Sequence, residues 1–479
     1  MGLKDKAIKG VGWSTLDTVC GQGVTFLVGI VLARLLSPAE YGLIGIILIF
    51  INLSNTIVDS GFSNALIRMQ YADDAAYNTG FLTNLGISVL LYALLFLSAP
   101  WIANFFSEPQ LAALLRVMGI IVVINAFTLI QRTILTKQID FKTQTKASLT
   151  SSVVSGLVGI VMALRGFGVW ALAGQQISRQ LLNMLCLWLL SQWRPCLVFS
   201  AKRFCEMWTF GWKLLVSSLI HTVFQEAFQV IIGKFYTAAT LGLYTRARQF
   251  RNPCSNTLTM VIQRVTYPLL SEIQDDRERL REGYRRVIRL TMLATFALMA
   301  GMAASARSMV ECLVGEQWLP CVPFLQLLCA MGALFPLHAI NLNMLKVQGR
   351  SDLFLRLEII KQVLNVGSIL LGIFVGIYWM LVGNIVVSLI AYWINAYYSG
   401  PFIGYGIWSQ VKDILPSLGL AALMAVPMLL MDYIPLPVWL LFPLQVAAGI
   451  AIWVLISERL QLPEYMELKA MGRSLKFRV

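Results

Sequence analysis

Long apolar segments separated by short polar ones run along nearly the whole chain. A stretch of about 20 apolar residues is long enough to cross the roughly 30 Å hydrocarbon core of a bilayer as a helix. The pattern therefore predicts an all-α integral membrane protein with about fourteen transmembrane helices. The expected spans are residues 12–36, 42–64, 80–105, 111–132, 146–165, 168–192, 210–234, 243–270, 288–313, 322–346, 354–375, 378–398, 413–433 and 437–457.

Four short patterns of the first half return in the second half in the same order. The pairs are Gly12-Trp13 and Gly211-Trp212, Tyr41–Leu43 and Leu241–Leu243, Leu135–Gln138 and Leu345–Gln348, and Trp170–Gly174 and Trp379–Gly383, at offsets of 199 to 210 residues. Transporters are often built from such duplicated helix bundles, with substrate held where the repeats meet. The repeat predicts a six-helix lobe at 1–192, a cytoplasmic linker at 193–209, a second six-helix lobe at 210–398, and two extra transmembrane helices with a basic cytoplasmic tail at 399–479.

The first helix of each half carries a polar stripe. The stripes are Ser14, Asp17, Thr18, Gly21, Gln22 and Thr25 in the first, and Ser218, His221, Thr222, Gln225, Glu226 and Gln229 in the second. Because lipid cannot satisfy polar groups, each stripe faces either other helices or a hydrated cavity. Asp17, Asp59 and Glu226 are the acids at membrane depth, and Glu226 is the preferred candidate for coupling transport to an ion gradient. Asp17 and Asp59 lie nearer the cytoplasmic ends of their spans, so structural ion pairs with Lys9 or Arg68 are an alternative for them.

Arginines within the spans are the second set of candidates. Arg179 lies well inside the sixth predicted span among glutamine and asparagine residues, and Arg246, Arg248 and Arg251 lie in the outer part of the eighth. A planar guanidinium suits phosphate because its donors can bind two oxygens at once. The alternatives are snorkelling to the interface and structural ion pairing.

Composition and charge agree with a membrane protein of defined orientation. The chain is 58% hydrophobic and 13% charged, with a net charge of +14. Lys and Arg collect in alternate loops, so the positive-inside rule places both termini in the cytoplasm. The eight cysteines are scattered without a C-x-x-C pattern, which favours free thiols in apolar packing.

No enzyme motif emerges from the chain. The two histidines, His221 and His338, have no metal-ligand spacing, and neither a P-loop nor a Gly-x-Ser-x-Gly pattern is found. We expect a transporter without catalytic residues, metal or cofactor. With no site for ATP, an ion gradient or the gradient of the substrate itself remains as the driving force.

Three motifs carry a family resemblance. Leu36–Gly42 (LSPAEYG), Gly166–Leu172 (GFGVWAL) and Leu241–Ala247 (LGLYTRA) resemble the polysaccharide-exporter branch of the multidrug/oligosaccharidyl-lipid/polysaccharide flippase superfamily. The resemblance implies two parallel six-helix lobes forming a V around a cationic cavity. It implies movement of a polyprenyl-pyrophosphate-linked oligosaccharide to the outer leaflet of the bacterial inner membrane, for O-antigen, capsule or exopolysaccharide. It also implies that arginines in the cavity bind the substrate, and this role falls on Arg179, Arg246, Arg248 and Arg251. A polymerase and glycosyltransferases of the same pathway are the implied protein partners.

Two other functions were weighed against this expectation. A cation-coupled multidrug exporter of the same superfamily would use fewer arginines and an aromatic or acidic pocket. A membrane-embedded glycan polymerase would need a large outer loop or a carboxylate constellation, and the predicted outer loops are short.

Overall fold

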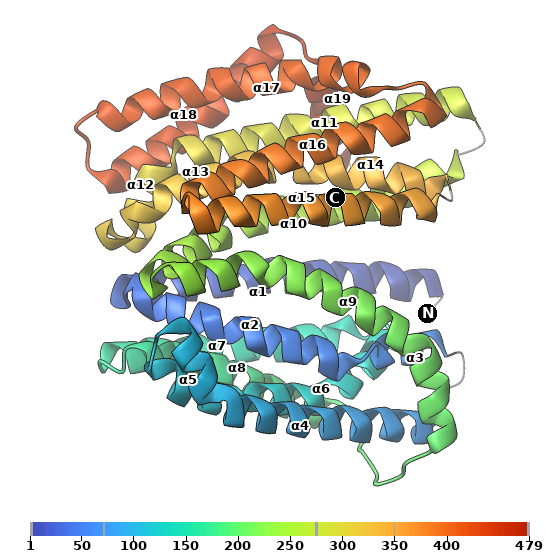
Figure 1. Ribbon diagram of the computed structural model, residues 1–479. Helices are drawn as coiled ribbons and strands as arrows, with labels where there is room; N and C mark the ends of the chain where they lie inside the picture. Colours follow the sequence, from blue (N-terminus) through green and yellow to red (C-terminus); the bar gives the residue numbers. More distant parts are fainter. Residues whose placement is uncertain (1–2, 70–71, 274–275, 349, 477–479) are drawn as a thin grey trace. The chain divides into compact units, whose positions relative to one another are not determined.

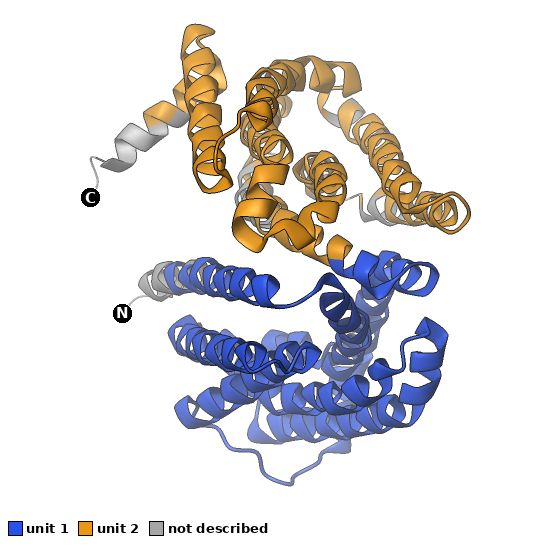
Figure 2. Ribbon diagram, turned by 90° about the vertical axis from the view of Figure 1, so that its left-hand side faces the viewer, with its two compact units in different colours: residues 1–242 blue, residues 243–479 orange. Residues whose placement is uncertain are grey.

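The computed structural model describes residues 3–69, 72–273, 276–348 and 350–476. These residues form nineteen α-helices and two short 3-10 helices, and no β-strand occurs among them. The chain divides into two compact units, residues 1–242 and 243–479 (Figure 2). Helix α10 (Ala238–Glu272) begins in the first unit and continues in the second.

The N-terminal unit is a bundle of long helices (Figure 1). Its helices are α1 (Leu3–Leu35), α2 (Pro38–Asp59), α3 (Phe62–Arg68), α4 (Asp74–Phe106), α5 (Gln110–Met118), α6 (Ile120–Lys137), α7 (Phe141–Leu164), α8 (Val169–Leu190) and α9 (Ala201–Phe235). Helix α7 packs against both α1 and α8, α6 packs against α4 and α8, and α9 packs against α2 and α4. Small residues of α7, including Ser151, Ser155 and Gly159, allow the close approach of its neighbours.

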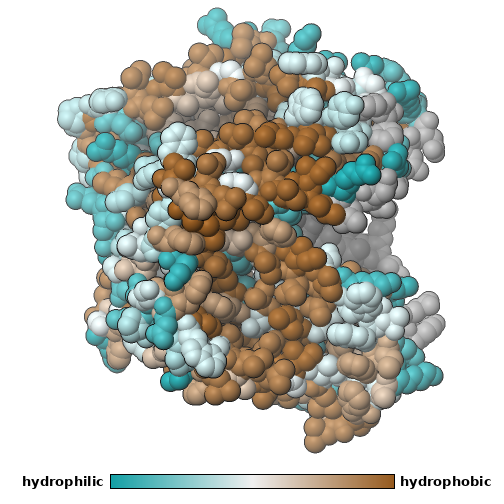
Figure 3. Space-filling model, viewed as in Figure 1, coloured by the Kyte–Doolittle hydropathy of each residue, from teal (hydrophilic) through white to brown (hydrophobic). Residues whose placement is uncertain are grey.

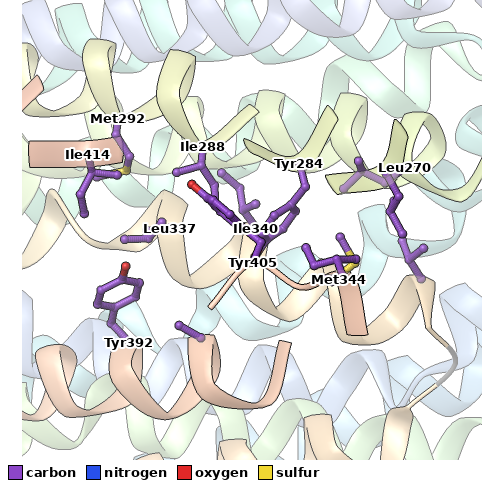
Figure 4. Packing of buried hydrophobic residues seen from close by; sticks show 14 of the residues in the cluster. Leu270, Tyr284, Ile288, Met292, Leu337, Ile340, Met344, Tyr392, Tyr405 and Ile414 are labelled. Carbon is purple, nitrogen blue, oxygen red and sulfur yellow. The ribbon is translucent and has the colours of Figure 1, made fainter. Parts of the chain in front are cut away.

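The C-terminal unit is built in the same way from helix pairs. Its helices after α10 are α11 (Arg277–Ala304), α12 (Ala306–Val314), α13 (Val322–Gly332), α14 (Phe335–Val347), α15 (Ser351–Phe374), α16 (Ile377–Ile403), α17 (Ile407–Leu430), α18 (Val438–Arg459) and α19 (Pro463–Lys476). The 3-10 helices are Glu316–Cys321 and Met431–Tyr433. Helix α11 packs along α17, and α15 packs along α16. Tyr284, Ile340 and Tyr405 are among the buried residues of the core that α11, α14 and α16 enclose (Figure 4).

One buried acid joins α17 to α11 in this unit. The Asp413 carboxylate accepts hydrogen bonds from Arg285, with Nε–Oδ2 at 2.5 Å, from Arg289, and from the Tyr405 hydroxyl at 2.6 Å. Asp413 is 7% exposed, so its charge is stable inside the protein only because these donors surround it. The hydrogen bonds of Asp413 therefore hold α17 against α11.

The membrane-protein class is confirmed. Among the described residues, twelve helical segments are long and apolar enough to cross a membrane. Their outward faces are apolar: Trp101 is 73% exposed, Phe374 81% and Trp408 76%, and Figure 3 shows hydrophobic residues over much of one face. Two of the fourteen expected spans, 168–192 and 243–270, coincide with α8 and α10. These two helices are long enough to cross a membrane, but they are not among the segments that are apolar enough to do so. The count of fourteen stays a prediction.

The lobe boundaries expected from the repeat also stay a prediction. The division into compact units falls at residue 242 rather than in the expected linker at 193–209. The physical reason is that α9, the expected first helix of the second lobe, packs against α2 and α4 of the first unit. Residues 191–200 connect α8 to α9 without a helix, and Cys196 N donates to Asn78 Oδ1 at 2.8 Å, which fixes this connection on α4.

The repeated Gly42 and Gly242 motifs lie against each other in the N-terminal unit. Ser37 caps α2 as its sequence predicts, because Glu40 Oε2 accepts from Ser37 N at 2.7 Å and the Ser37 hydroxyl accepts from Glu40 N. A Cβ on Gly42 would overlap the carbonyl of Ala238, and a Cβ on Gly242 would overlap the carbonyl of Pro38. The starts of α2 and α10 therefore cross so closely that only glycine fits at either position.

Candidate functional site

A polar cavity opens among α2, α6, α7 and α8 of the N-terminal unit. Its volume is about 490 Å³, within the usual range of about 300–1,000 Å³ for small-molecule sites. It is lined by Asn55, Val58, Asn125, Thr128, Leu129, Arg132, Ser148, Ser151, Arg179, Gln180 and Asn183. Nine of these eleven side chains are polar or charged, so the cavity is suited to a hydrophilic ligand.

Helical spacing brings these residues to one space. On α6, Asn125, Thr128 and Arg132 stand at i, i+3 and i+7, which places them on one helix face. On α8, Arg179 and Asn183 are one turn apart near the middle of the helix. The short side chains of Ser148 and Ser151 on α7 leave room for the cavity between these helices.

Two arginines supply the positive charge of the cavity. Among the described residues, neither the Arg132 nor the Arg179 guanidinium has an ion-pair or hydrogen-bond partner. Asp17 of α1 interacts electrostatically with both, without forming an ion pair with either, and its Oδ1 is a buried acceptor without a partner. The cavity lining therefore holds two cations, with Asp17 near enough to act on both, and the two guanidiniums have donors available for an anionic ligand.

The structure places Arg179 in the lining of this polar cavity together with Arg132, which is not among the residues expected from the sequence. Substrate binding by Arg179 stays a prediction. The expected fourth span, 111–132, ends at this residue, so the sequence pattern leaves Arg132 at the edge of the span. The helix continues to Lys137, which leaves Arg132 more than a turn inside. In the sequence, Arg132 can be recognised as a residue of the polar helix face by its spacing of seven and four residues from Asn125 and Thr128.

Amide side chains form the remainder of the polar wall. Asn125 Nδ2 donates to Asn55 Oδ1 at 3.2 Å, which holds these two amides together across α6 and α2. Asn183 is 6% exposed, and its amide has no hydrogen bond to any described residue. The amide lines the cavity and is not one of the fully buried polar groups, so a ligand or water in the cavity can reach it. The arrangement can bind an oxyanion at the guanidiniums and hydroxyl groups at the amides.

The three other candidate arginines lie outside the lining of this cavity, in α10 of the C-terminal unit. Arg246 is 4% exposed; its Nη1 donates to Gln249 Oε1 at 2.9 Å, and its guanidinium lies over the Phe250 and Trp318 rings. Arg251 is 5% exposed and lies 4.9 Å from the centre of the Phe335 ring. Such cation–π packing contributes to the stability of the unit. Arg248 is half-buried. Substrate binding by these three stays a prediction.

The acid candidates occupy different surroundings. Asp59, at the end of α2, accepts hydrogen bonds from Ser63 N at 3.4 Å and Ser63 Oγ at 2.5 Å, so it holds the first turn of α3. Among the ion pairs of the described residues none joins Asp59 to Arg68, and Arg68 lies over the Phe210 ring instead. The side chain of Lys9, the expected partner of Asp17, lies outside the described residues.

Glu226 is the most buried of the three acids, at 9% exposure. Its Oε1 accepts from Asn52 Nδ2 at 3.2 Å, and its Oε2 accepts from Gln229. One turn away, Thr222 and Thr56 form a second hydrogen bond of 3.2 Å between α9 and α2. This part of the α9 stripe therefore makes helix-to-helix hydrogen bonds, one of the two expectations for it.

The comparisons with known proteins point to polysaccharide export. A family described as "Polysaccharide biosynthesis protein" matches residues 31–323, more than half of the chain. The succinoglycan biosynthesis transport protein ExoT of Rhizobium meliloti is 25% identical over 80% of this chain and 78% of its own. The lipopolysaccharide biosynthesis protein WzxC of Escherichia coli is 26% identical over 78% of this chain and 76% of its own.

Solved structures show that the fold is shared with transporters. The lipid II flippase MurJ, in an inward closed conformation, superposes with a TM-score of 0.75, covering 96% of this chain and 99% of that one at 15% identity. An inward-facing multidrug resistance MATE family transporter of the MOP superfamily gives a TM-score of 0.59, covering 80% of this chain and 95% of that one at 17% identity. At these identities the likeness concerns the fold alone.

Proposed function

We propose that this chain, a member of the polysaccharide biosynthesis protein family, is a flippase for a polyprenyl-diphosphate-linked glycan. It would move the lipid from the cytoplasmic to the outer leaflet of the bacterial inner membrane, with both chain termini in the cytoplasm. It acts as a transporter and not as an enzyme. A polymerase and glycosyltransferases of the same pathway would consume and supply the glycan.

The observation that carries the proposal is the cavity with two unpaired guanidiniums in one polar wall. A diphosphate cannot cross hydrocarbon without compensation for its charge, because burying an isolated ion is very unfavourable. Arg132 and Arg179 supply that compensation, and the planar guanidinium matches phosphate oxygens with paired donors. Asn55, Asn125 and Asn183 offer donors and acceptors to sugar hydroxyls, while the polyprenyl chain stays in the lipid.

Alternating access completes the mechanism. The cavity opens to one leaflet, binds the diphosphate, and then opens to the other leaflet, as expected for transporters with sites near the bilayer midplane. The two arginines are already in place on α6 and α8, so binding requires little ordering of side chains.

Glu226 is the acid that we propose for coupling to an ion gradient. Asp17 is less suited, because it lies near the two arginines. A proton on Asp17 removes a negative charge from the anion site and so favours substrate binding, whereas an exchanger needs proton and substrate to exclude each other. Glu226 is not among the groups that act on Arg132 or Arg179, so a proton on Glu226 does not favour anion binding there in this way. Asp59 remains a third candidate, although its hydrogen bonds to Ser63 favour a structural role.

The function is tested by flipping in proteoliposomes. The purified protein is reconstituted with a polyprenyl diphosphate that carries a short glycan with a fluorescent label, and outer-leaflet label is quenched chemically. We expect Arg132→Ala and Arg179→Ala to slow flipping at equal protein content. Arg116→Ala is the matched control, since Arg116 lies on α5 over the Phe96 ring, outside the cavity. Equal flipping by protein-free liposomes, or by all three variants, would reject the proposal.

A further inference from the structure

Helix α9 is longer than the thickness of a membrane requires. Its 35 residues extend about 52 Å as a straight helix, whereas the hydrocarbon core is roughly 30 Å thick. Between residues 214 and 233 the only charged side chain is Glu226, and this stretch alone is long enough to span the core. The preceding residues 201–213, the α9 start, carry four charged side chains: Lys202, Arg203, Glu206 and Lys213. The surplus length of α9 therefore lies at its beginning, outside the hydrocarbon.

The α9 start does not follow the direction of the spanning helices. Figure 1 shows α9 changing direction: its first turns run across the other long helices of the unit, and the remainder runs along them. Gly211 packs against the break between α2 and α3, where a Cβ on it would lie 2.7 Å from the Ser60 carbonyl oxygen. Arg203 forms ion pairs of 2.8 Å with Asp73, which caps α4, and with Glu206. These contacts hold the α9 start against α3 and α4 on one side.

The side chains of the α9 start divide into three sectors around the helix. Phe204, Met207 and Phe210 pack into the core of the unit. An exposed apolar sector covers about 60° of arc at 3.6 residues per turn and consists of Ala201, Cys205, Trp208 and Trp212. Beside it an exposed polar sector of about 60° consists of Lys202, Glu206, Thr209 and Lys213. A helix in a membrane interface presents an apolar sector to lipid and a polar one to headgroups and water, and the α9 start has both.

The connection before α9 continues the exposed apolar surface. Leu197 is 92% exposed, and Val198 and Phe199 are exposed beside it. The Phe199, Phe204 and Trp208 rings follow one another at centroid distances of 6.0 and 6.1 Å. Tryptophan is enriched at the level of the lipid headgroups, because its ring is apolar and its N–H is polar. The apolar surface therefore extends from the connection along the α9 start and ends in side chains typical of a membrane interface.

Two lysines give this surface a positive charge. Arg203 is neutralised by its two carboxylate partners. Lys202 forms no ion pair with a described residue, and Lys213 lies 6.0 Å from the centroid of the Trp212 ring. Lysine side chains beside an apolar sector extend to the headgroups, where they attract acidic lipids.

We propose that residues 197–213 form an interfacial anchor in the leaflet where α9 begins. Leu197, Trp208 and Trp212 contact lipid acyl chains, and Lys202 and Lys213 bind the phosphates of acidic phospholipids. A soluble protein suits this surface less well, because α9 enters the membrane without a break and so keeps its start at the bilayer. The linker expected at 193–209 is then bound to the membrane over most of its length. The anchor depends neither on the flippase function nor on which side of the membrane is cytoplasmic.

The test measures quenching of a bimane fluorophore by brominated phospholipids in nanodiscs that hold the full-length protein. The fluorophore is attached to Cys205 of the apolar sector after the other cysteines are replaced by alanine. The discs hold equal amounts of phosphatidylglycerol and phosphatidylcholine, and one of the two carries bromine on its acyl chains. We expect both to quench, and brominated phosphatidylglycerol to quench about two- to fivefold more, because each lysine near the headgroups attracts acidic lipid. Lys202→Gln combined with Lys213→Gln should remove this difference and leave quenching by phosphatidylcholine.

The matched control moves the fluorophore to the polar sector. Thr209→Cys as the single cysteine lies about one turn from Cys205 and should be quenched less by both lipids and more by aqueous acrylamide. Equal quenching at the two positions, or stronger acrylamide quenching at Cys205, overturns the anchor. Equal quenching by the two lipids with both lysines present overturns the binding of acidic lipid. Protection of Cys205 from lipid and acrylamide alike assigns the apolar sector to a protein contact and also decides against the proposal. If the protein labelled at Cys205 does not fold, Ala201→Cys in the same sector decides in its place.

Discussion

Removal of Arg132 and Arg179, singly and together, probes whether both guanidiniums hold one diphosphate. Neither forms an ion pair or hydrogen bond with a described residue, and Asp17 interacts electrostatically with both, so alanine at one position still leaves Asp17 with the other arginine. Each substitution instead deletes at least one charge-assisted hydrogen bond to the ligand, and we take the loss as that of one bond, about 1.5–3 kcal/mol. Each single variant should therefore bind polyprenyl diphosphate about 10- to 150-fold more weakly, at 1.4 kcal/mol per tenfold.

The double variant tests whether the two residues act on the same ligand. Independent sites add within about 0.5 kcal/mol, whereas residues that share a partner show a coupling energy of roughly 0.5–3 kcal/mol. We expect a coupling above that threshold. Arg179→Lys should recover only part of the affinity, because an ammonium is a point charge without the paired donors of a guanidinium.

The assay is titration of the purified variants with polyprenyl diphosphate in nanodiscs, with thermal melting as the check on folding. Arg116→Ala again serves as the control, since it removes a guanidinium of the same unit outside the cavity. Unchanged affinity in Arg179→Ala at wild-type melting temperature would remove Arg179 from the site. Strict additivity in the double variant would refute a shared ligand even if each single variant were weakened.

Four further outcomes follow from the same structure. Glu226→Gln should abolish the response of flipping to an imposed pH or sodium gradient while leaving substrate binding intact; a wild-type response would reject it as the coupling acid. Asp17→Asn should tighten diphosphate binding, because it removes the one anion that opposes a ligand at the two arginines, and weaker binding would contradict this. In a background without cysteine, Arg279→Cys should resist labelling from outside intact cells while Glu108→Cys is labelled, and the reverse would invert the topology. Gly242→Ala should lower stability by about 1–3 kcal/mol, since its Cβ would overlap the Pro38 carbonyl, and an unchanged melting temperature would contradict that crossing.

Local chemistry along the chain was sufficient to predict the class of this protein and to select candidate site residues. The length of an apolar run decides whether a helix can span a bilayer, and this property belongs to one segment alone. The Ser37–Glu40 cap is equally local, and the structure confirms it. Arg179 and Glu226 could be selected because a charged group within a predicted span is unfavourable unless it faces polar partners or a hydrated cavity inside the protein.

The tertiary structure decided which groups surround each charge. Arg132 joins Arg179 only because α6 and α8 pack side by side around one cavity, whereas Arg246 and Arg251 lie over aromatic rings. The sequence places Glu226 on a polar stripe of its own helix. Its aromatic neighbours Phe50 and Trp101 come from α2 and α4, which are distant from it in sequence, so only the packing of the helices brings them together. The physical reason is that hydropathy is a property of one helix, whereas the free energy of a buried charge depends on the neighbours that packing brings to it.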